Sequence, residues 1–257
     1  MFEAVLSAET WKKCVTAIGS LVEEVPLKIT AEGIELRAMD PSHVSMIDFK
    51  MNKEVFAEYK NDKEAIIGID IEDMSKFINR SRSDDILVLK LDEEKNKILM
   101  VLKGTSTRRF GCQLIDVTEQ SNLKMPALNT TSKVRMSSQA FREGLKDANI
   151  VSDHVSLKAD DAFYMNAEGD TGDIEVKLEK GDPDLYEIIV SAGASSTFNL
   201  SYLTDMSKSI PGEMSIEIGS DMPVKIEFEI EGASFVFILA PRVERWEVTW
   251  ENIMTTL

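Results

Sequence analysis

With 257 residues, 43% of them apolar and 29% charged, the chain has the composition of a soluble globular protein and enough length for two domains. No apolar run approaches the roughly 18 residues of a membrane span, and the N-terminus has no signal-peptide pattern, so we expect the protein to stay in the compartment where it is made. The net charge of −16 argues against nucleic-acid binding unless basic residues gather on one surface.

The first half opens with a predicted strand over residues 2–6 and a helix over residues 7–22. Ser7 suits the N-cap position, and Glu9 lies near the positive end of the helix dipole. Alternating apolar residues then predict antiparallel strands with one solvated face, and a second short helix follows. The strands are expected at 27–29, 33–38, 44–51, 85–91, 97–102 and 108–115, and the second helix at 72–81.

The second half follows the same order, with helices near 138–150 and 202–209 and strands at 213–218, 224–230 and 234–239. Between the halves, residues 116–133 show little periodicity and suit an exposed connecting loop. This loop carries Leu123, Met125 and Leu128, which either hold the loop on the surface or form one wall of a docking groove.

An internal repeat underlies this order. Sliding the sequence against itself by 129 positions aligns apolar residues in five segments, which chance alternation explains poorly. The matches are Ile34, Leu36 and Ala38 on Phe163, Met165 and Ala167; Ile47 and Phe49 on Val176 and Leu178; Ile69, Ile71, Met74 and Phe77 on Phe198, Leu200, Leu203 and Met206; Leu87 and Leu89 on Ile216 and Ile218; Leu99 and Val101 on Phe228 and Ile230. The sequence therefore predicts an α+β protein of two similar β-rich domains, over 1–115 and 134–245, with a connecting loop at 116–133 and a tail at 246–257.

The residues of common catalytic and metal sites are sparse. Cys14 and Cys112 are best explained as small buried apolar residues, and two histidines make no metal-ligand pattern. Asp40, Ser42 and His43 include the residue types of a hydrolase triad, but adjacent residues in one loop have the wrong geometry. Acidic pairs such as Asp84 with Asp85 fall at predicted turns, where solvation is the usual explanation. We expect no enzyme activity, no cofactor and no metal.

Several segments resemble the proliferating cell nuclear antigen family of DNA sliding clamps. They are MFEAVL at the start, RAMDPSHVSMIDF from Arg37, MSKF in the second helix, LIDV from Leu114, DMPVKIEFEI from Asp221 and FILAPRVE from Phe237. The resemblance covers roughly residues 1–244 in order. LAPRVE and the short loops favour an archaeal member, which implies a cytoplasmic, nucleoid-associated protein; a eukaryotic member would be nuclear.

The resemblance implies a clamp fold in which three subunits close head to tail into a ring of pseudo-sixfold symmetry, with helices lining the hole. Such a ring would be the processivity factor for DNA polymerase and a docking platform for replication and repair proteins. Head-to-tail contacts of this kind form a closed ring when the rotation that relates neighbouring subunits adds up to a full turn. The implied subunit interface pairs two strand edges, which contribute Arg108, Phe110, Cys112 and Leu114 from one subunit and Asp173, Ile174, Val176 and Leu178 from the next.

The predicted helices carry the candidate DNA surface. Together with Arg82, the four helical stretches hold eight basic and six acidic residues, a net of +2 that leaves −18 for the rest of the chain. The alternative is an ordinary solvated helix face. The expected contacts are to phosphates, without reading of base sequence. The candidates are Lys12, Lys13, Lys76, Arg80, Arg82, Arg142, Lys146 and Lys208.

A second candidate site is an apolar groove for partner peptides, as the resemblance implies. Flexible methionine side chains suit a pocket that accepts many partners. Polymerase, clamp loader, flap endonuclease and DNA ligase would dock there through short helical turns. The groove residues are Met39, His43, Val44, Met46, Ile115, Leu123, Met125, Pro126, Pro223, Ile238, Leu239, Ala240 and Pro241. The bland alternative is that the methionines are core residues.

Two rival functions stay open at this stage. One is a subunit of a heterotrimeric or checkpoint-type clamp, which shares the fold without self-association. The other is a carboxylate-metal nuclease, which would need several acidic side chains converging in a cleft. The residues after Glu244 depart from the family pattern, and Trp246, Trp250 and Leu257 share one face of a possible helix.

Overall fold

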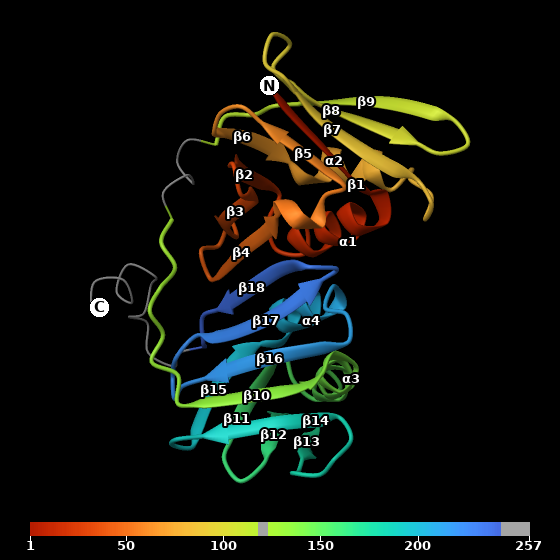
Figure 1. Ribbon diagram of the computed structural model, residues 1–257. Coiled ribbons are helices and arrows are strands. Elements are labelled where there is room, and N and C mark those ends of the chain that lie inside the picture. Colours follow the sequence, from red (N-terminus) through yellow and green to blue (C-terminus); the bar gives the residue numbers. More distant parts are fainter. Residues whose placement is uncertain (118–122, 243–257) are drawn as a thin grey trace. The chain divides into compact units, whose positions relative to one another are not determined.

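The computed structural model describes residues 1–117 and 123–242, so the 243–257 tail and its tryptophans lie outside the described residues (Figure 1). The chain divides into two compact units. Met1–Pro41, Ile47–Leu123 and Glu229–Phe235 form the first unit. Ser42–Met46, Lys124–Phe228 and residues 236–242 form the second.

The first unit holds two sheets and two helices. One sheet has the strand order β5-β1-β7-β8-β9, and β4-β3-β2-β6 follow one another in the other. The elements are β1 (Phe2–Ser7), α1 (Ala8–Ile18), β2 (Glu24–Ile29), β3 (Gly33–Met39), β4 (Ser45–Asn52), the 3-10 helix η1 (Lys53–Val55), β5 (Glu58–Asn61), β6 (Ala65–Asp70), α2 (Ile71–Ile78), β7 (Ile86–Asp92), β8 (Lys97–Lys103) and β9 (Thr107–Gln113).

The second unit repeats this arrangement, with strand orders β14-β10-β16-β17 and β13-β12-β11-β15. Figure 1 shows β10 running between β14 and β16. The elements are β10 (Ser132–Ser137), α3 (Ser138–Ala148), β11 (His154–Ala159), β12 (Phe163–Gly169), β13 (Gly172–Leu178), β14 (Leu185–Val190), β15 (Ala194–Asn199), α4 (Leu200–Lys208), β16 (Glu213–Ile218), β17 (Val224–Ile230) and β18 (Ala233–Leu239).

The predicted duplication is confirmed, because each half of the described chain runs through nine strands and two helices in the same order. The constant offset of 129 is wrong. Ser7 and Ser137 end the first strands 130 positions apart, whereas Met100 and Ile226 occupy matching positions in β8 and β17 only 126 apart. Turns of different length cause this drift. Between β7 and β16 the offset is 127, and an error of two still aligns apolar residues, since side chains alternate with period two. Between β8 and β17 the error is three, so the match of Leu99 and Val101 with Phe228 and Ile230 joins opposite faces.

All four helices begin in the same way. The last residue of the preceding strand has extended backbone angles, and its side chain accepts a hydrogen bond from an amide of the first turn. These N-caps satisfy amides that the helix itself leaves free, which fixes where each helix starts. The capping residues are Ser7, Asp70, Ser137 and Asn199. The expected cap at Ser7 is therefore confirmed.

Each long helix packs one apolar stripe on its own unit. In α1 the stripe includes Trp11, Val15 and Ile18, all at most 1% exposed. In α3 a Cβ at Gly144 would lie 2.6 Å from the sulfur of Met165 in β12, so a larger residue there would require the Met165 side chain to move. The helices end one to four residues earlier than their periodicity predicted, because the residues that follow lie in turns. The sequence also did not predict β5 and β6 as separate strands.

One acidic pair is not a solvated turn. Asp84 is exposed, but Asp85 is only 2% exposed. Its carboxylate accepts a hydrogen bond from the Arg82 amide at 2.8 Å and pairs with the guanidinium of Arg108. Arg108 also donates to the Arg80 carbonyl, so it ties β9 to the turn after α2. Solvation is therefore the wrong explanation for Asp85.

Replacing Asp85 with Asn should lower the free energy of unfolding by about 2–3 kcal/mol, because a half-buried guanidinium then loses its counter-charge. Urea denaturation at neutral pH measures the change. Asp84→Asn is the matched control and should stay within about 0.5 kcal/mol of the parent protein, as exposed substitutions do. Equal losses in the two variants would contradict a special role for the Asp85 carboxylate.

The two cysteines are buried and unpaired, as predicted. Burial raises the pKa of the Cys112 thiol to about 11 and raises that of Cys14 as well. Both thiols are therefore neutral at physiological pH and act as small apolar groups.

Candidate nucleic-acid and partner interfaces

The basic residues predicted to meet DNA lie on or just after two helix pairs. In the first unit α1 contacts α2, and in the second α3 contacts α4 (Figure 1). The helices bury one face against their own sheets and leave the lysines on the other. Lys13, Lys76, Lys146 and Lys208 are all exposed, and Lys12 is half-buried.

On α1, Lys13 is held by a carboxylate from a distant part of the chain. Its ammonium lies 2.6 Å from Glu231, a residue of the turn between β17 and β18. Glu231 adopts a left-handed φ of 49° and also accepts a hydrogen bond from the Thr10 hydroxyl. The Lys13 ammonium and the Thr10 hydroxyl lower the pKa of Glu231, and Glu231 raises that of Lys13. Lys12 has no such ion pair in the part of the chain that the structure describes.

The other three helices carry their carboxylates one turn before the lysine. Lys76 lies 3.0 Å from Asp73 and also pairs with Glu72. The bond to Asp73, followed by that to Glu72, raises the pKa of Lys76. In the second unit Lys146 pairs with Glu143 at 2.8 Å and Lys208 with Asp205 at 2.7 Å.

The arginines of the set are engaged within their own units. Arg142 donates to the hydroxyl of Ser138 and to the carbonyls of Ser207 and Ile210, so it joins α3 to the end of α4. Arg82 donates to the Thr105 hydroxyl at 2.8 Å. These contacts make Arg142 mainly a positioning residue, and they leave Lys12, Arg80 and the exposed lysines as the groups that an anion reaches most readily.

The predicted subunit-interface strands lie at sheet edges. β9 ends the five-stranded sheet and β13 ends the four-stranded sheet of the second unit. On β9, Phe110 stacks on Phe77 with ring centroids 5.2 Å apart, and Cys112 is buried. Together with the Arg108–Asp85 pair, these contacts direct the predicted β9 side chains toward their own unit. A neighbouring subunit could therefore contact the backbone edge of β9 and its exposed side chains Arg109 and Gln113.

The β13 edge alternates between half-buried and exposed side chains. Ile174, Val176 and Leu178 are half-buried on the side facing the unit, while Asp173 is exposed. A strand edge with unpaired backbone groups and half-covered apolar residues is a template for a further strand. Leu114, just past β9, is half-buried and donates its amide to the Asn96 carbonyl.

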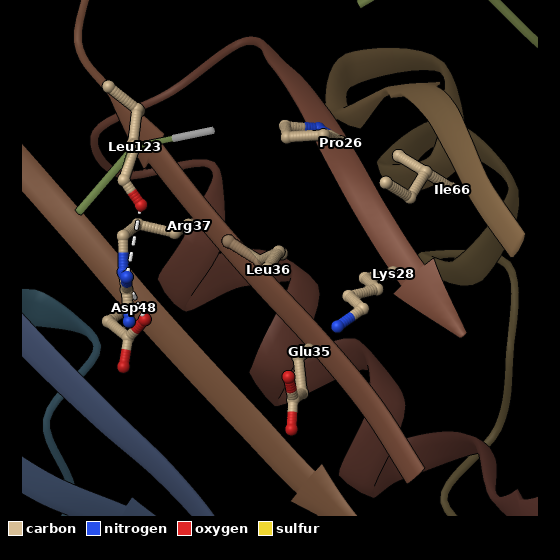
Figure 2. Close-up of a pocket in the computed structure, with 8 residues that line it drawn as sticks. All are labelled: Pro26, Lys28, Glu35, Leu36, Arg37, Asp48, Ile66 and Leu123. Carbon is tan, nitrogen blue, oxygen red and sulfur yellow. Dashed lines mark hydrogen bonds and ion pairs between the residues drawn. The ribbon is translucent and has the colours of Figure 1, made fainter. Parts of the chain in front are cut away.

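In the first unit the candidate groove residues lie where the connecting loop begins. Figure 2 shows the Arg37 guanidinium between the Leu123 carbonyl, at 3.0 Å, and the Asp48 carboxylate, at 2.7 Å. Ile115 donates to the Gly68 carbonyl at 3.1 Å, and a Cβ at Gly68 would lie 2.1 Å from the Ile115 oxygen. Arg37 and Gly68 thus fix the two described ends of the loop on this unit.

A shallow cavity of about 210 Å³ lies beside Arg37. Its walls combine apolar side chains with an ion pair, and the exposed Ile66 lies on its rim (Figure 2). The lining residues are Pro26, Lys28, Glu35, Leu36, Arg37, Asp48, Ile66 and Leu123. Met39 is half-buried at the end of β3.

In the second unit the groove candidates separate into buried and accessible residues. Met46, Ile238 and Leu239 are at most 2% exposed, and Pro126 and Pro223 are also buried. The accessible members are His43, Val44, Met125, Ala240 and Pro241. His43 has a left-handed φ of 57°, and the Ala240 amide donates to the Val44 carbonyl at 2.9 Å. Here the loop around Val44 and the end of β18 lie side by side.

Sequence reasoning missed three residues that organise these surfaces. Arg37 lies within the resembling segment but was not assigned to the site, and only its place on β3 beside Asp48 reveals its contact with the loop. Glu231 lies more than 200 positions from Lys13, so no local spacing signals that pair. Gly68 could have been noticed, because a glycine inside an apolar strand often marks a close backbone approach.

No group of three or more His, Cys, Asp or Glu side chains among the described residues is arranged to hold a metal ion. Within the same residues, no helix has the length and apolar character needed to cross a bilayer.

Comparison with known families gives two matches that follow one another along the chain. Residues 1–134 match the model for the proliferating cell nuclear antigen N-terminal domain, and residues 124–243 match the model for the C-terminal domain. Both models together span the two units, so the match covers more than half of the chain.

Individual proteins give the same result. The chain is 43% identical to a DNA polymerase sliding clamp of Methanococcus vannielii over 250 residues, covering 95% of this chain and all of that protein. Among solved structures it is similar to the proliferating cell nuclear antigen of Thermococcus kodakaraensis, with a TM-score of 0.90, 27% identity and coverage of 94% and 100% of the two chains. It is also similar to that of Archaeoglobus fulgidus, solved with the C-terminal region of FEN-1 bound, with a TM-score of 0.85, 26% identity and coverage of 95% and 100%.

Proposed function

Because the chain belongs to the proliferating cell nuclear antigen family, we infer that it is a DNA polymerase sliding clamp. The observation that carries this function is the duplicated unit, in which each copy presents a pair of helices with outward lysines. In a chain with a net charge of −16, these helices are where phosphates would find cations. No finding favours the heterotrimeric, checkpoint-type or nuclease alternatives.

We propose that three copies form the ring, with the β9 edge of one subunit beside the β13 edge of the next. Both strands end their sheets, and both carry half-buried residues on the side facing their own unit. Pairing them would satisfy the free backbone groups of both edges and remove two exposed strand edges per junction. Each subunit supplies one edge of each kind, so the contact is heterologous, and three copies close into a ring if the rotation at each junction is one third of a turn.

In this proposal, partner peptides bind at the groove residues that are accessible to solvent. A relative from Archaeoglobus fulgidus binds the C-terminal region of FEN-1. A flap endonuclease is therefore the first partner to test, and polymerase, clamp loader and ligase follow from the same docking mode. Tethering requires no chemical step and no cofactor. The proposed place of action is with the DNA in an archaeal-type cell.

The domain limits remain a proposal: 1–115 and 134–245, joined by 116–133 and followed by a 246–257 tail. The two family models meet between residues 124 and 134, which supports a junction in that stretch.

Retention on circular DNA tests the function. The protein is loaded by its clamp loader on a nicked circle, and the circle is then cut once. A sliding clamp stays on the circle and leaves the linear product, because topology and not affinity holds it. Protein that stays bound after cutting, or that is retained on the uncut circle without the loader, would indicate an ordinary DNA-binding protein. The mass in solution should correspond to a trimer.

Replacing Lys12 and Lys13 together with Gln should lower affinity for a short duplex by about tenfold and flatten its salt dependence, because phosphate contacts are lost. Lys12→Gln alone should give most of this effect, since Lys13 is already paired with Glu231. Fluorescence anisotropy over a salt series measures both quantities. The solution mass should not change. Duplex affinity equal to that of the parent protein would remove α1 from the proposed DNA surface.

A further inference from the structure

Each of the four helices places a lysine in an ion pair, although these are the lysines proposed to contact DNA. The separations run from 2.6 Å for Lys13–Glu231 to 3.0 Å for Lys76–Asp73. Three of the carboxylates, Asp73, Glu143 and Asp205, lie one helical turn before their lysine. Acidic residues usually stabilise the first turn of a helix, but Glu143 and Asp205 lie past that turn, so the helix dipole does not explain them.

The fourth pair shows that the feature does not depend on local spacing. Thr10 and Lys13 on α1 face a turn that lies more than 200 residues further along the chain, where Glu231 has a left-handed backbone conformation. Glu231 reaches both the Thr10 hydroxyl and the Lys13 ammonium. A carboxylate thus comes to the lysine of α1 by tertiary structure, where the other helices supply one from within.

All four pairs remain open to solvent. The lysine side chains are 45–67% exposed, and their carboxylate partners 45–58%. A phosphate can therefore reach each ammonium, but it meets a cation that already has a partner. Exposed pairs of this kind are weak, so a phosphate exchanges with the carboxylate instead of being excluded.

We propose that Asp73, Glu143, Asp205 and Glu231 act as internal competitors for the DNA phosphates and keep the ring's contact with DNA weak and exchangeable. This inference rests on the proposed function. Without the carboxylates, the four lysines would present bare charge to a polyanion, and the ring would hold each phosphate longer. With them, an ammonium released by one phosphate returns to its carboxylate before it meets the next. These four carboxylates would set how readily the ring moves along the duplex.

The test compares two triple variants with the same change in charge. Asp73→Asn, Glu143→Gln and Asp205→Asn together free Lys146 and Lys208 and leave Lys76 paired with Glu72 alone. Glu231 is left in place because it also bonds to the buried Thr10. The control, Glu93→Gln, Asp160→Asn and Glu187→Gln, neutralises carboxylates that pair with Lys63, Lys158 and Arg135 away from the helices. Each variant changes one residue in the first unit and two in the second.

Equilibrium binding of a short end-labelled duplex is measured over a salt series, and movement of the loaded ring is followed on stretched DNA. Each freed lysine should tighten binding about two- to fivefold, the range expected for exposed ion pairs, so the helix variant with two freed lysines should gain at least about fourfold. Its salt dependence should also steepen, because more counterions are released. The loaded ring should diffuse more slowly by a similar factor.

Two results would overturn the proposal while leaving the function intact: unchanged affinity in the helix variant, or an equal gain in the control, which would mean that only net charge matters. Failure of the parent protein to stay on circular DNA would instead refute the proposed function. Thermal unfolding of all three proteins shows whether any change in binding reflects loss of folding.

Discussion

Replacing Ile174 with Glu should convert the trimer into monomers. Ile174 lies half-buried on the β13 edge, where the next subunit would cover it. Burying a carboxylate there and losing the apolar contact should cost about 2–4 kcal/mol at each junction. A ring of three subunits suffers that loss three times. Light scattering across a dilution series should show one third of the parent mass, and retention on circular DNA should disappear.

Ile189→Glu is the matched control. Ile189 is 54% exposed on β14, which also lies at a sheet edge of the second unit but outside the proposed junction. The same chemical change there should leave the trimer intact. If Ile174→Glu stays trimeric, or if both variants dissociate alike, the proposed pairing of β9 with β13 is wrong. Circular dichroism confirms that either variant is folded.

The second large effect is expected at the partner groove. Val44→Glu should weaken binding of the C-terminal peptide of the organism's flap endonuclease by at least about tenfold, as removal of a central apolar contact does. Val44 is half-buried, and its carbonyl is bonded to the amide of Ala240. Isothermal titration with the intact ring measures the affinity. Ile238 is a poorer probe because it is 1% exposed, and an arginine there would disturb packing.

Val55→Glu serves as the control for the peptide experiment. Val55 is half-buried at the end of η1 and is not a groove residue. It should bind the peptide as the parent protein does, and both variants should keep the trimer mass and DNA retention. Peptide affinity that is unchanged in Val44→Glu would place the docking surface elsewhere, whereas a loss of trimer would show that the change acts on folding.

Local signals predicted the elements well. A strand that ends in Ser, Asp or Asn, followed by apolar residues at helical spacing, marks all four helices in the sequence. Of their caps only Ser7 was predicted, and α2 and α4 begin at Ile71 and Leu200, before the predicted positions 72 and 202, because Asp70 and Asn199 cap them. The duplication was also visible, because both halves bury the same faces. The short strands β5 and β6 escaped notice because charged or glycine residues interrupt their alternation.

The features that could not be predicted from the sequence depend on contacts between residues that are distant along the chain. Asp84 and Asp85 are identical in type and adjacent, yet one is solvated and the other is buried beside Arg108. Nothing local distinguishes them. The same holds for the lysines of the helices: composition gave the net of +2, but whether each ammonium is free depends on carboxylates placed by folding. Ile238 at the end of β18 and Ala240 just after it were both groove candidates, and the sequence could not show that only Ala240 is accessible.

The Arg108 guanidinium has a consequence for the whole assembly. It is bonded to both the Asp85 carboxylate and the Arg80 carbonyl. These bonds connect β9, the strand proposed to join subunits, to the turn that carries Arg80 and Arg82. A displacement of β9 at the proposed junction would therefore be transmitted to Arg80 and Arg82, so the geometry of the subunit seam sets where these two arginines stand.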